Sequence, residues 1–399
     1  MEGSATLSGP AVRPKGGEEH TVALKYSLIG AALAMGTIGA IGSVGVFGAI
    51  VAAGPQTAPA TAAPASAAPA TTAPAGATIP AERRLANVRQ LTFGGENAEA
   101  YFSKDGQRLI FQSTREGVAC DQIFSMKLDG SDVRRVSTGK GRTTCGYFYP
   151  DGRSIVYAST HLGGEACPPK PSFARGYVWP IYASYDIFRA NADGSGLTPL
   201  TSTPGYDAEA TIGPDGRIVF TSVRDGDMEI YSMKSDGTDV RRLTHRLGPD
   251  GGPFFSNDGS LIVFRGRELA AGRELDDYRA LLKDGLWRPT SLEIFVMKAD
   301  GSDVRQVTRN GAANFAPFFH PDGQRIIFAS NQHDPKGRDF DLYLVNVDGT
   351  GSERVTFNGT FDGFPMFSPD GTSLVFASNR LAKAEGETNV FIADWIDRP

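Results

Sequence analysis

Short apolar strands separated by Asp-Gly turns recur along most of this chain. In the phrase FPMFSPDGTSLVFASNR (364–380), Asp370-Gly371 lies between an aromatic strand and a β-branched one. An Asp-Gly pair between two strands is typical of a β-hairpin. Five earlier copies of the phrase carry their aspartates at Asp105, Asp151, Asp215, Asp258 and Asp322. The pattern therefore predicts six repeated units.

A second series of Asp-Gly turns alternates with the first, and the distance from each to the next aspartate of the first series is 22 residues in all five cases. Four short strands per repeat at a fixed period are typical of a β-propeller blade. We label these strands A to D in chain order. The second series comprises Asp129, Asp193, Asp236, Asp300 and Asp348.

The two ends of the array predict how the ring closes. The first recognisable unit is a lone D strand at 87–92, and the last unit stops after its C strand at 389–395. Because a closed ring leaves only short edges, we expect the N-terminal D strand to complete the sixth blade. The predicted fold is all-β: a six-bladed β-propeller of four-stranded blades with interlocked ends, preceded by one transmembrane helix.

The N-terminal part predicts a membrane anchor. Residues 26–53 form a run of 28 without a charge, longer than the roughly 20 needed to span a bilayer core. Basic residues precede this run and none follows closely, which places the N-terminus in the cytoplasm and the rest outside. A cleaved signal peptide ending near Ala53 is the alternative, although its apolar region would be unusually long.

These features divide the chain into four parts. We expect a cytoplasmic segment at 1–25, a transmembrane helix at 26–53, a Pro/Ala-rich linker at 54–81 and the propeller at 82–399. The linker cannot build a core and should act as a semi-extended spacer. The expected location is the inner (cytoplasmic) membrane, crossed once, with the propeller in the periplasm.

Glycine recurs at every third residue of the expected anchor. Small residues let helices approach closely in lipid, so the stripe favours packing against another membrane helix, although membrane helices also tolerate glycine for its own sake. The stripe comprises Gly36, Gly39, Gly42, Gly45 and Gly48.

Charge and composition narrow the function classes. The formal net charge is −5 and the repeats contain no basic block, so nothing favours nucleic acid as a partner. The sequence has no Gly-x-Ser-x-Gly elbow and no His-Glu-x-x-His helix, which disfavours a hydrolase. No cofactor, catalytic residue or metal site is predicted.

The variation in loop length falls on one face of the propeller. In an up-and-down blade both Asp-Gly series share one face, here called the turn face, and the B–C and D–A loops share the other, the insertion face. The separations from the first series to the second are 24, 42, 21, 42 and 26 residues, so the second and fourth blades carry long B–C insertions. Function on a repeat scaffold usually lies where insertions collect.

Both insertions carry aromatic residues. The one at 161–185 is rich in proline, and the one at 273–289 predicts a short amphipathic helix that ends near Gly285. Such residues either anchor a partner or form a lid on the propeller itself, and the sequence leaves both open. The candidate interface residues are Phe173, Tyr177, Trp179, Tyr182, Tyr278 and Trp287.

Acidic residues gather in the D–A loops, which should surround the mouth of the central channel. A ring of carboxylates would bind a cation or a basic peptide, or it would line the channel and cap nearby backbone groups. The candidates are Glu99, Asp207, Glu209, Asp250 and Asp362.

A second polar column opens the C strands. We interpret it as scaffold, with Arg115, Arg224 and Arg380 as expected hydrogen-bond partners. The column comprises Gln122, Asp186, Glu229, Glu293, Asp341 and Asn389.

The three cysteines, Cys120, Cys145 and Cys167, also lie on the insertion face. An extracytoplasmic location permits a disulfide. We expect one bridge and one free thiol, with the pairing left open.

The phrases FSPDGTSLVFASNR (367–380) and DIF (186–188), followed by an Asp-Gly turn, resemble the propeller repeat of the TolB-type family, which also occurs in prolyl-oligopeptidase-like enzymes. The resemblance covers about 87–397 and implies a six-bladed extracytoplasmic propeller used mainly for protein contacts. TolB itself carries a small α/β domain where this chain has its expected anchor.

Three functions follow from the sequence. The first is a non-enzymatic, membrane-anchored scaffold or accessory subunit of a larger membrane protein complex. The second is a binding module for a peptide, sugar or cation at the channel mouth. The third is a regulatory propeller related to prolyl-oligopeptidase-like enzymes.

Overall fold

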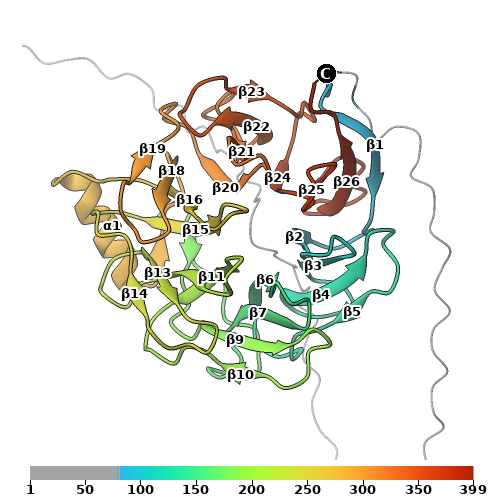
Figure 1. Cartoon of the computed structure of the whole chain (residues 1–399). Helices are drawn as coiled ribbons and strands as arrows, with labels where there is room; N and C mark the ends of the chain where they lie inside the picture. The colour runs from blue at the N-terminus through green and yellow to red at the C-terminus, as the bar shows by residue number, and fades with distance from the viewer. Residues whose placement is uncertain (1–78, 80, 399) are drawn as a thin grey trace, which may run out of the picture.

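Six four-stranded antiparallel sheets stand around a central axis in the computed structural model (Figure 1), which describes residues 79 and 81–398. The predicted six-bladed all-β propeller is thereby confirmed for this part of the chain. Blade one contains β2 (Asn97–Phe102), β3 (Arg108–Ser113), β4 (Gln122–Lys127) and β5 (Arg134–Arg135), and blade two contains β6 (Thr143–Phe148), β7 (Ser154–Ser159), β9 (Asp186–Asn191) and β10 (Thr198–Pro199). Blade three contains β11 (Asp207–Ile212), β12 (Ile218–Ser222), β13 (Glu229–Met233) and β14 (Arg241–Arg242), and blade four contains β15 (Asp250–Phe255), β16 (Leu261–Gly266), β18 (Glu293–Lys298) and β19 (Arg305–Gln306). Blade five contains β20 (Asn314–Phe319), β21 (Arg325–Ser330), β22 (Asp341–Asn346) and β23 (Glu353–Arg354).

Blade six is built from both ends of the repeat region. Its strands β24 (Asp362–Phe367), β25 (Ser373–Ser378) and β26 (Asn389–Trp395) are completed by β1 (Leu85–Gln90), which pairs antiparallel with β26. Figure 1 shows the blue N-terminal strand beside the red C-terminal one. The ring therefore closes as the lone D strand predicted.

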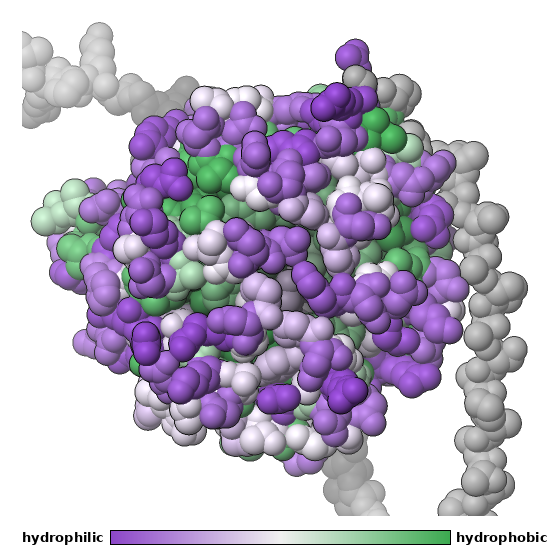
Figure 2. All heavy atoms as spheres, viewed as in Figure 1, coloured by the Kyte–Doolittle hydropathy of each residue, from purple (hydrophilic) through white to green (hydrophobic). Residues whose placement is uncertain are grey.

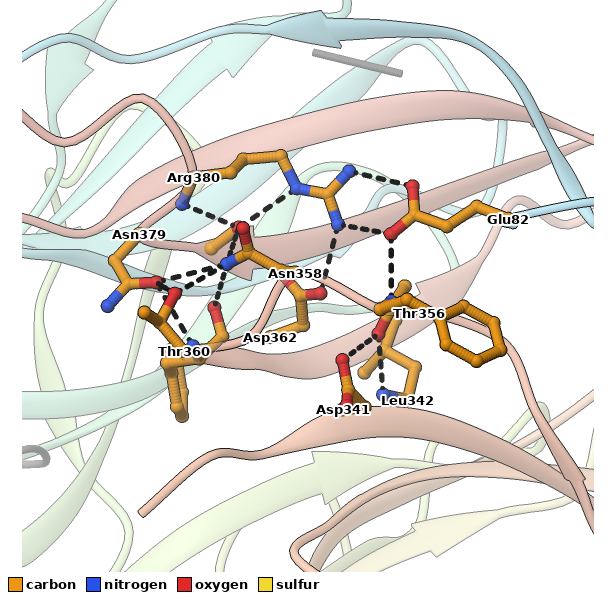
Figure 3. Close-up of polar contacts among 12 residues, drawn as sticks. Glu82, Asp341, Leu342, Thr356, Asn358, Thr360, Asp362, Asn379 and Arg380 are labelled. Carbon is orange, nitrogen blue, oxygen red and sulfur yellow. Dashed lines mark hydrogen bonds and ion pairs between the residues drawn. The ribbon is translucent and has the colours of Figure 1, made fainter. Parts of the chain in front are cut away.

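A buried polar network locks this closure. Glu82, just before β1, accepts two hydrogen bonds from Arg380, both 3.0 Å long, and Arg380 also donates to Asp362 at 2.9 Å (Figure 3). The three residues are between 0% and 5% exposed. The segment before β1 is thus tied to blade six by charge as well as by strand pairing.

The Asp-Gly turns stabilise themselves locally. In the last blade, Asp370 accepts hydrogen bonds from the Ser368 hydroxyl at 2.6 Å and from the Thr372 backbone at 3.1 Å, and Gly371 has φ of 73°. The Ser368 hydroxyl is the main cause of the lowered pKa of Asp370, and the backbone bond adds to it. The turn face is therefore repetitive because each turn needs the same two residues.

The two insertions add three elements. The fourth-blade insertion forms the predicted helix, α1 (Arg273–Lys283), and then β17 (Leu286–Trp287), which pairs with β8 (Trp179–Pro180) of the second-blade insertion. The helix buries Leu275, Tyr278 and Leu281. The two insertions, which are far apart in sequence, therefore form one joined structure.

The expected anchor at 26–53, its glycine stripe and nearly all of the linker lie outside the described residues. Within residues 79 and 81–398, no helix has the length and apolar character that crossing a bilayer requires.

Candidate functional site

The third residue of every A strand sits in a β-bulge. The pairing register shifts at this point in each blade, for example between Ala98 and Tyr101 of β2. A left-handed backbone costs a non-glycine residue about 1 kcal/mol or more, and a bulge re-aims its side chain. The six bulge residues, called the bulge ring below, have φ between 47° and 59° and are Glu99, Cys145, Glu209, Gly252, Ala316 and Phe364.

Bulge residues of neighbouring blades meet near the axis. The Cys145 thiol and the Glu99 carboxylate lie close enough to shift each other's pKa. The Gly252 backbone donates to Glu209 at 2.9 Å, and Arg265 donates to the other oxygen of Glu209 at 2.6 Å. Because these contacts join blade one to two and three to four, the bulge ring surrounds the channel mouth.

Aromatic rings close the channel below the bulge ring. Two residues further along the A strands, Tyr101 contacts Phe254 of the opposite blade at 5.4 Å between ring centroids, and both contact Tyr147. Phe318 packs on Phe254 at 5.4 Å. These rings therefore form an aromatic floor under the bulge ring, and the region around the bulge ring on the insertion face is called the chamber below.

A pocket lies on the turn face, beside this floor. It has a volume of about 90 Å³ and is lined by the ends of the A strands. Lys104 of blade one reaches across it to Asn257 of blade four, at 2.9 Å. Tyr147 and Phe318 of the ring cluster also line this pocket.

Glu99 carries a strongly perturbed carboxylate. Burial raises its pKa from 4.5 to about 7, opposed by the Cys145 thiol and assisted by the charge of Glu209. The Oε2 atom is buried and makes no hydrogen bond of normal length with any described residue. Glu99 thus exchanges its proton near neutral pH in a site that offers one unused acceptor atom.

Glu209 faces the same chamber, but its pKa is lowered where that of Glu99 is raised. Burial by itself raises its pKa, but the charge of Arg265 and the Thr221 hydroxyl, which donates at 2.6 Å, outweigh burial and lower the pKa overall. Glu209 is therefore an ionised, internally paired carboxylate.

The other three carboxylates predicted at the mouth are parts of buried ion pairs. Each opens an A strand, is at most 1% exposed and contacts an arginine from an adjacent loop. Burial raises the pKa of Asp250 to about 7 and also raises that of Asp362. The pairs are Asp207 with Arg224, Asp250 with Arg246, and Asp362 with Arg380.

The column that opens the C strands is scaffold, but the expected arginine partners were mostly wrong. Its members are held by hydroxyls of the following D strand, as when Thr244 donates to Glu229 and Thr308 donates to Glu293. Of the three expected arginines, Arg224 and Arg380 instead hold the A-strand aspartates. Arginines of the D strands, Arg242 and Arg354, pair with Glu229 and Asp341 in place of the expected loop arginines.

The joined insertions form a lid beside the chamber. Trp179 packs edge-on against Trp287 at 5.6 Å and stacks on Phe315 of blade five at 5.4 Å. Tyr278 and Trp287 are buried, at 6% and 3% exposure, so they belong to the inside of the lid. Tyr177, Trp179 and Tyr182 are half-buried, and Phe173 is exposed.

An aromatic strip that no sequence pattern predicted continues from the lid. Ring contacts at 5.7, 6.4 and 6.3 Å link Phe315 to Phe340, Phe361 and Phe364 in turn. All four side chains are half-buried. In the view of Figure 2, hydrophilic side chains cover most of the surface and hydrophobic ones form separate patches. The chamber mouth therefore has a carboxylate side in blades one to three and an aromatic side in blades five and six.

Cys120 and Cys167 form a disulfide and Cys145 is free and buried. Of the three pairings that the sequence left open, this one ties the start of the second-blade insertion to blade one. The free thiol is the member of the bulge ring beside Glu99.

Comparison with known proteins supports a TolB-type propeller. A family model described as the TolB β-propeller domain matches residues 281–385. The TolB homologue of Chlorobium luteolum is 26% identical over 287 residues, covering 64% of each chain. A solved structure described as a TolB from Agrobacterium tumefaciens superposes with a TM-score of 0.51 at 20% identity, covering 76% of this chain and 91% of that one.

The similarity also extends to a protein named as an uncharacterized peptidase. The peptidase YuxL of Bacillus subtilis is 26% identical over 203 residues, which are 46% of this chain and 29% of that protein. This chain thus spans under two thirds of the length of these curated relatives.

Proposed function

We propose that this protein is a non-enzymatic, membrane-anchored propeller that acts as an interaction scaffold or accessory subunit of a larger membrane protein complex. Its insertion face is the docking surface. The observation that carries the proposal is the joined lid: two long insertions fold together on one face, while the turn face carries only short, repeated turns.

The chemistry of the lid supports docking. Interface centres are enriched in aromatic residues, and the second-blade insertion leaves Phe173 36% exposed beside half-buried Tyr177 and Tyr182. The buried Tyr278 and Trp287 supply a rigid base, so little conformational entropy would be lost on binding.

The uncharged run at 26–53 supports an inner-membrane location with the propeller in the periplasm. The Cys120–Cys167 disulfide agrees with an oxidising compartment. Protease treatment of spheroplasts tests the topology: the propeller should be digested from outside while the membrane stays intact, and protection would refute the orientation.

Co-migration tests the scaffold. The full chain is extracted from native membranes in mild detergent and separated by size, and we expect it to run with a stoichiometric membrane complex. Phe173→Ser should release it from that complex. Val304→Ser is the matched control, since Val304 is 37% exposed and lies on the turn face. A wild-type chain that migrates alone would refute the proposal.

A second candidate is a binding module for a peptide, sugar or cation at the channel mouth. The buried Glu99 oxygen without a hydrogen-bond partner favours it. A basic peptide should raise the melting temperature of the wild-type chain and not of Glu99→Gln, because a ligand that binds only the folded state stabilises it. Equal shifts for both would refute this site.

The third candidate, a regulatory propeller of a prolyl-oligopeptidase-like enzyme, rests on the likeness to YuxL, of which 29% is covered. No pair of described side chains favours it over the scaffold.

A further inference from the structure

Blade five contains a cluster of possible ligand atoms, in which His333 and Asp339 lie beside Asp341 of the scaffold column. His333 and Asp339 come from its B–C loop and Asp341 opens β22. The Nε2 atom of His333 lies 3.1 Å from an Asp339 oxygen and 3.3 Å from an Asp341 oxygen. One ligand atom from each residue falls within 4.8 Å of the others.

We propose that His333, Asp339 and Asp341 bind a divalent first-row transition-metal ion of the zinc type. Zinc bonds nitrogen and carboxylate oxygen at 2.0–2.2 Å in tetrahedral geometry, which places neighbouring ligand atoms about 3.3 Å apart. The two distances from Nε2 match that spacing. One imidazole and two carboxylates leave a fourth position for water.

The histidine ring is held in the orientation that a metal ligand requires. Its Nδ1 atom is 3.0 Å from the Tyr343 hydroxyl, and the two rings stack. A metal-bound histidine typically uses its second nitrogen in a hydrogen bond that fixes the ring. Tyr343 thus leaves Nε2 facing the two carboxylates.

The carboxylates retain capacity for a cation. Asp339 has an Oδ1 atom that is buried without a hydrogen-bond partner among the described residues. Asp341 is 0% exposed and also holds Arg354 and Thr356. With neutral His333, the two carboxylates and Arg354 leave one net negative charge for a dication to offset.

Blade three provides the internal comparison. Glu229 corresponds to Asp341, since both open a C strand opposite the last serine of the B strand. There Tyr231 bonds Asp225 in place of a histidine. Asp227 is occupied by hydrogen bonds from the Tyr278 hydroxyl and the Met228 backbone. The same scaffold is thus internally satisfied in blade three and has unused ligand atoms in blade five.

The site also has a structural consequence. The loop between His333 and Asp341 carries Arg338, whose guanidinium lies 5.3 Å from the centre of the Tyr177 ring in the lid. Phe340 of the same loop belongs to the aromatic strip. A bound ion would tie this loop to β22 and so fix one support of the lid.

Zinc titration of the full chain tests the site. The tag-free protein, purified in detergent and stripped with a chelator, is titrated with Zn²⁺ against a chromophoric competitor. We expect one tight zinc ion per chain, with magnesium unable to compete because it prefers oxygen ligands. His333→Gln and Asp339→Asn should each weaken binding by at least about tenfold.

Asp225→Asn is the matched control and should bind zinc like the wild type. Circular dichroism of each metal-free variant establishes that it is folded, and zinc should raise the melting temperature of the wild type and the control only. The alternative is a plain ion pair between protonated His333 and the two aspartates. Absence of stoichiometric zinc, or equal binding by wild type and folded variants, would establish that pair and overturn the proposal.

Discussion

Glu99→Gln should stabilise this protein at alkaline pH and leave it nearly unchanged in acid. The wild-type carboxyl has a pKa of about 7 in the folded state against an ordinary value of 4.5, because burial disfavours its charge. Glutamine keeps the size and the acceptor oxygen of the neutral form. The substitution therefore removes only the ionisation.

The sign follows from proton linkage. Between pH 4.5 and about 7 the folded protein retains a proton that the unfolded chain has lost, so the free energy of unfolding falls as the pH rises. The pKa difference corresponds to about 3 kcal/mol at most. Below pH 4.5 Glu99 is neutral in both states and contributes nothing to this dependence.

Denaturant unfolding of the full chain, followed by tryptophan fluorescence at several pH values, measures the effect. The difference in the free energy of unfolding between Glu99→Gln and wild type separates the effect of Glu99 from that of other titrating groups such as Asp250. We expect the variant to gain 1–3 kcal/mol between pH 4.5 and pH 8. A stability difference that is constant with pH would refute the assigned burial, and a loss at pH 8 would show that the ionised carboxylate is favourably paired.

Two further predictions concern the ring and the lid. Arg380→Met leaves Glu82 and Asp362 as buried, unpaired carboxylates and should lower the free energy of unfolding by about 3–5 kcal/mol. Arg241→Met, at an exposed ion pair in blade three, should lower it by under about 1 kcal/mol. Equal losses of stability in urea unfolding would contradict the role of the Arg380 network in ring closure. Replacing Cys120 and Cys167 by serine opens a loop of 47 residues. The chain-entropy model then predicts a loss of about 4 kcal/mol in the free energy of unfolding. A wild-type protein that unfolds at the same denaturant concentration with and without reductant would contradict this prediction.

The repeat architecture could be predicted because its signals are local. Each Asp-Gly turn is stabilised by residues within two positions of the aspartate, as Asp370 is by Ser368 and Thr372. The strand period then fixes which residues face the core. Ring closure followed from counting strands, and α1 from its amphipathic pattern, whose buried face comprises Leu275, Tyr278 and Leu281.

The site was less predictable because it depends on geometry between blades. The sequence places Glu99 and Asp207 in similar loops. In the structure, Glu99 is the third residue of β2, where the bulge turns it into the chamber, whereas Asp207 is the first residue of β11 and pairs with Arg224. No residue type marks the bulge, since glutamate, cysteine, glycine, alanine and phenylalanine all occur there. The pairing of β8 with β17 joins insertions more than 100 residues apart.

The bulge ring also bears on where function resides. Glycine adopts a left-handed backbone without strain, yet Gly252 is the one glycine of the bulge ring. The other five blades place a residue with a side chain in this strained conformation. At Glu99 two costs coincide, a strained backbone and a carboxylate that burial keeps from ionising. Costs of this kind persist where surrounding structure enforces them and cluster at functional sites. Under the proposed docking function, the lid would supply apolar area and the buried Oε2 of Glu99 an acceptor for a basic group.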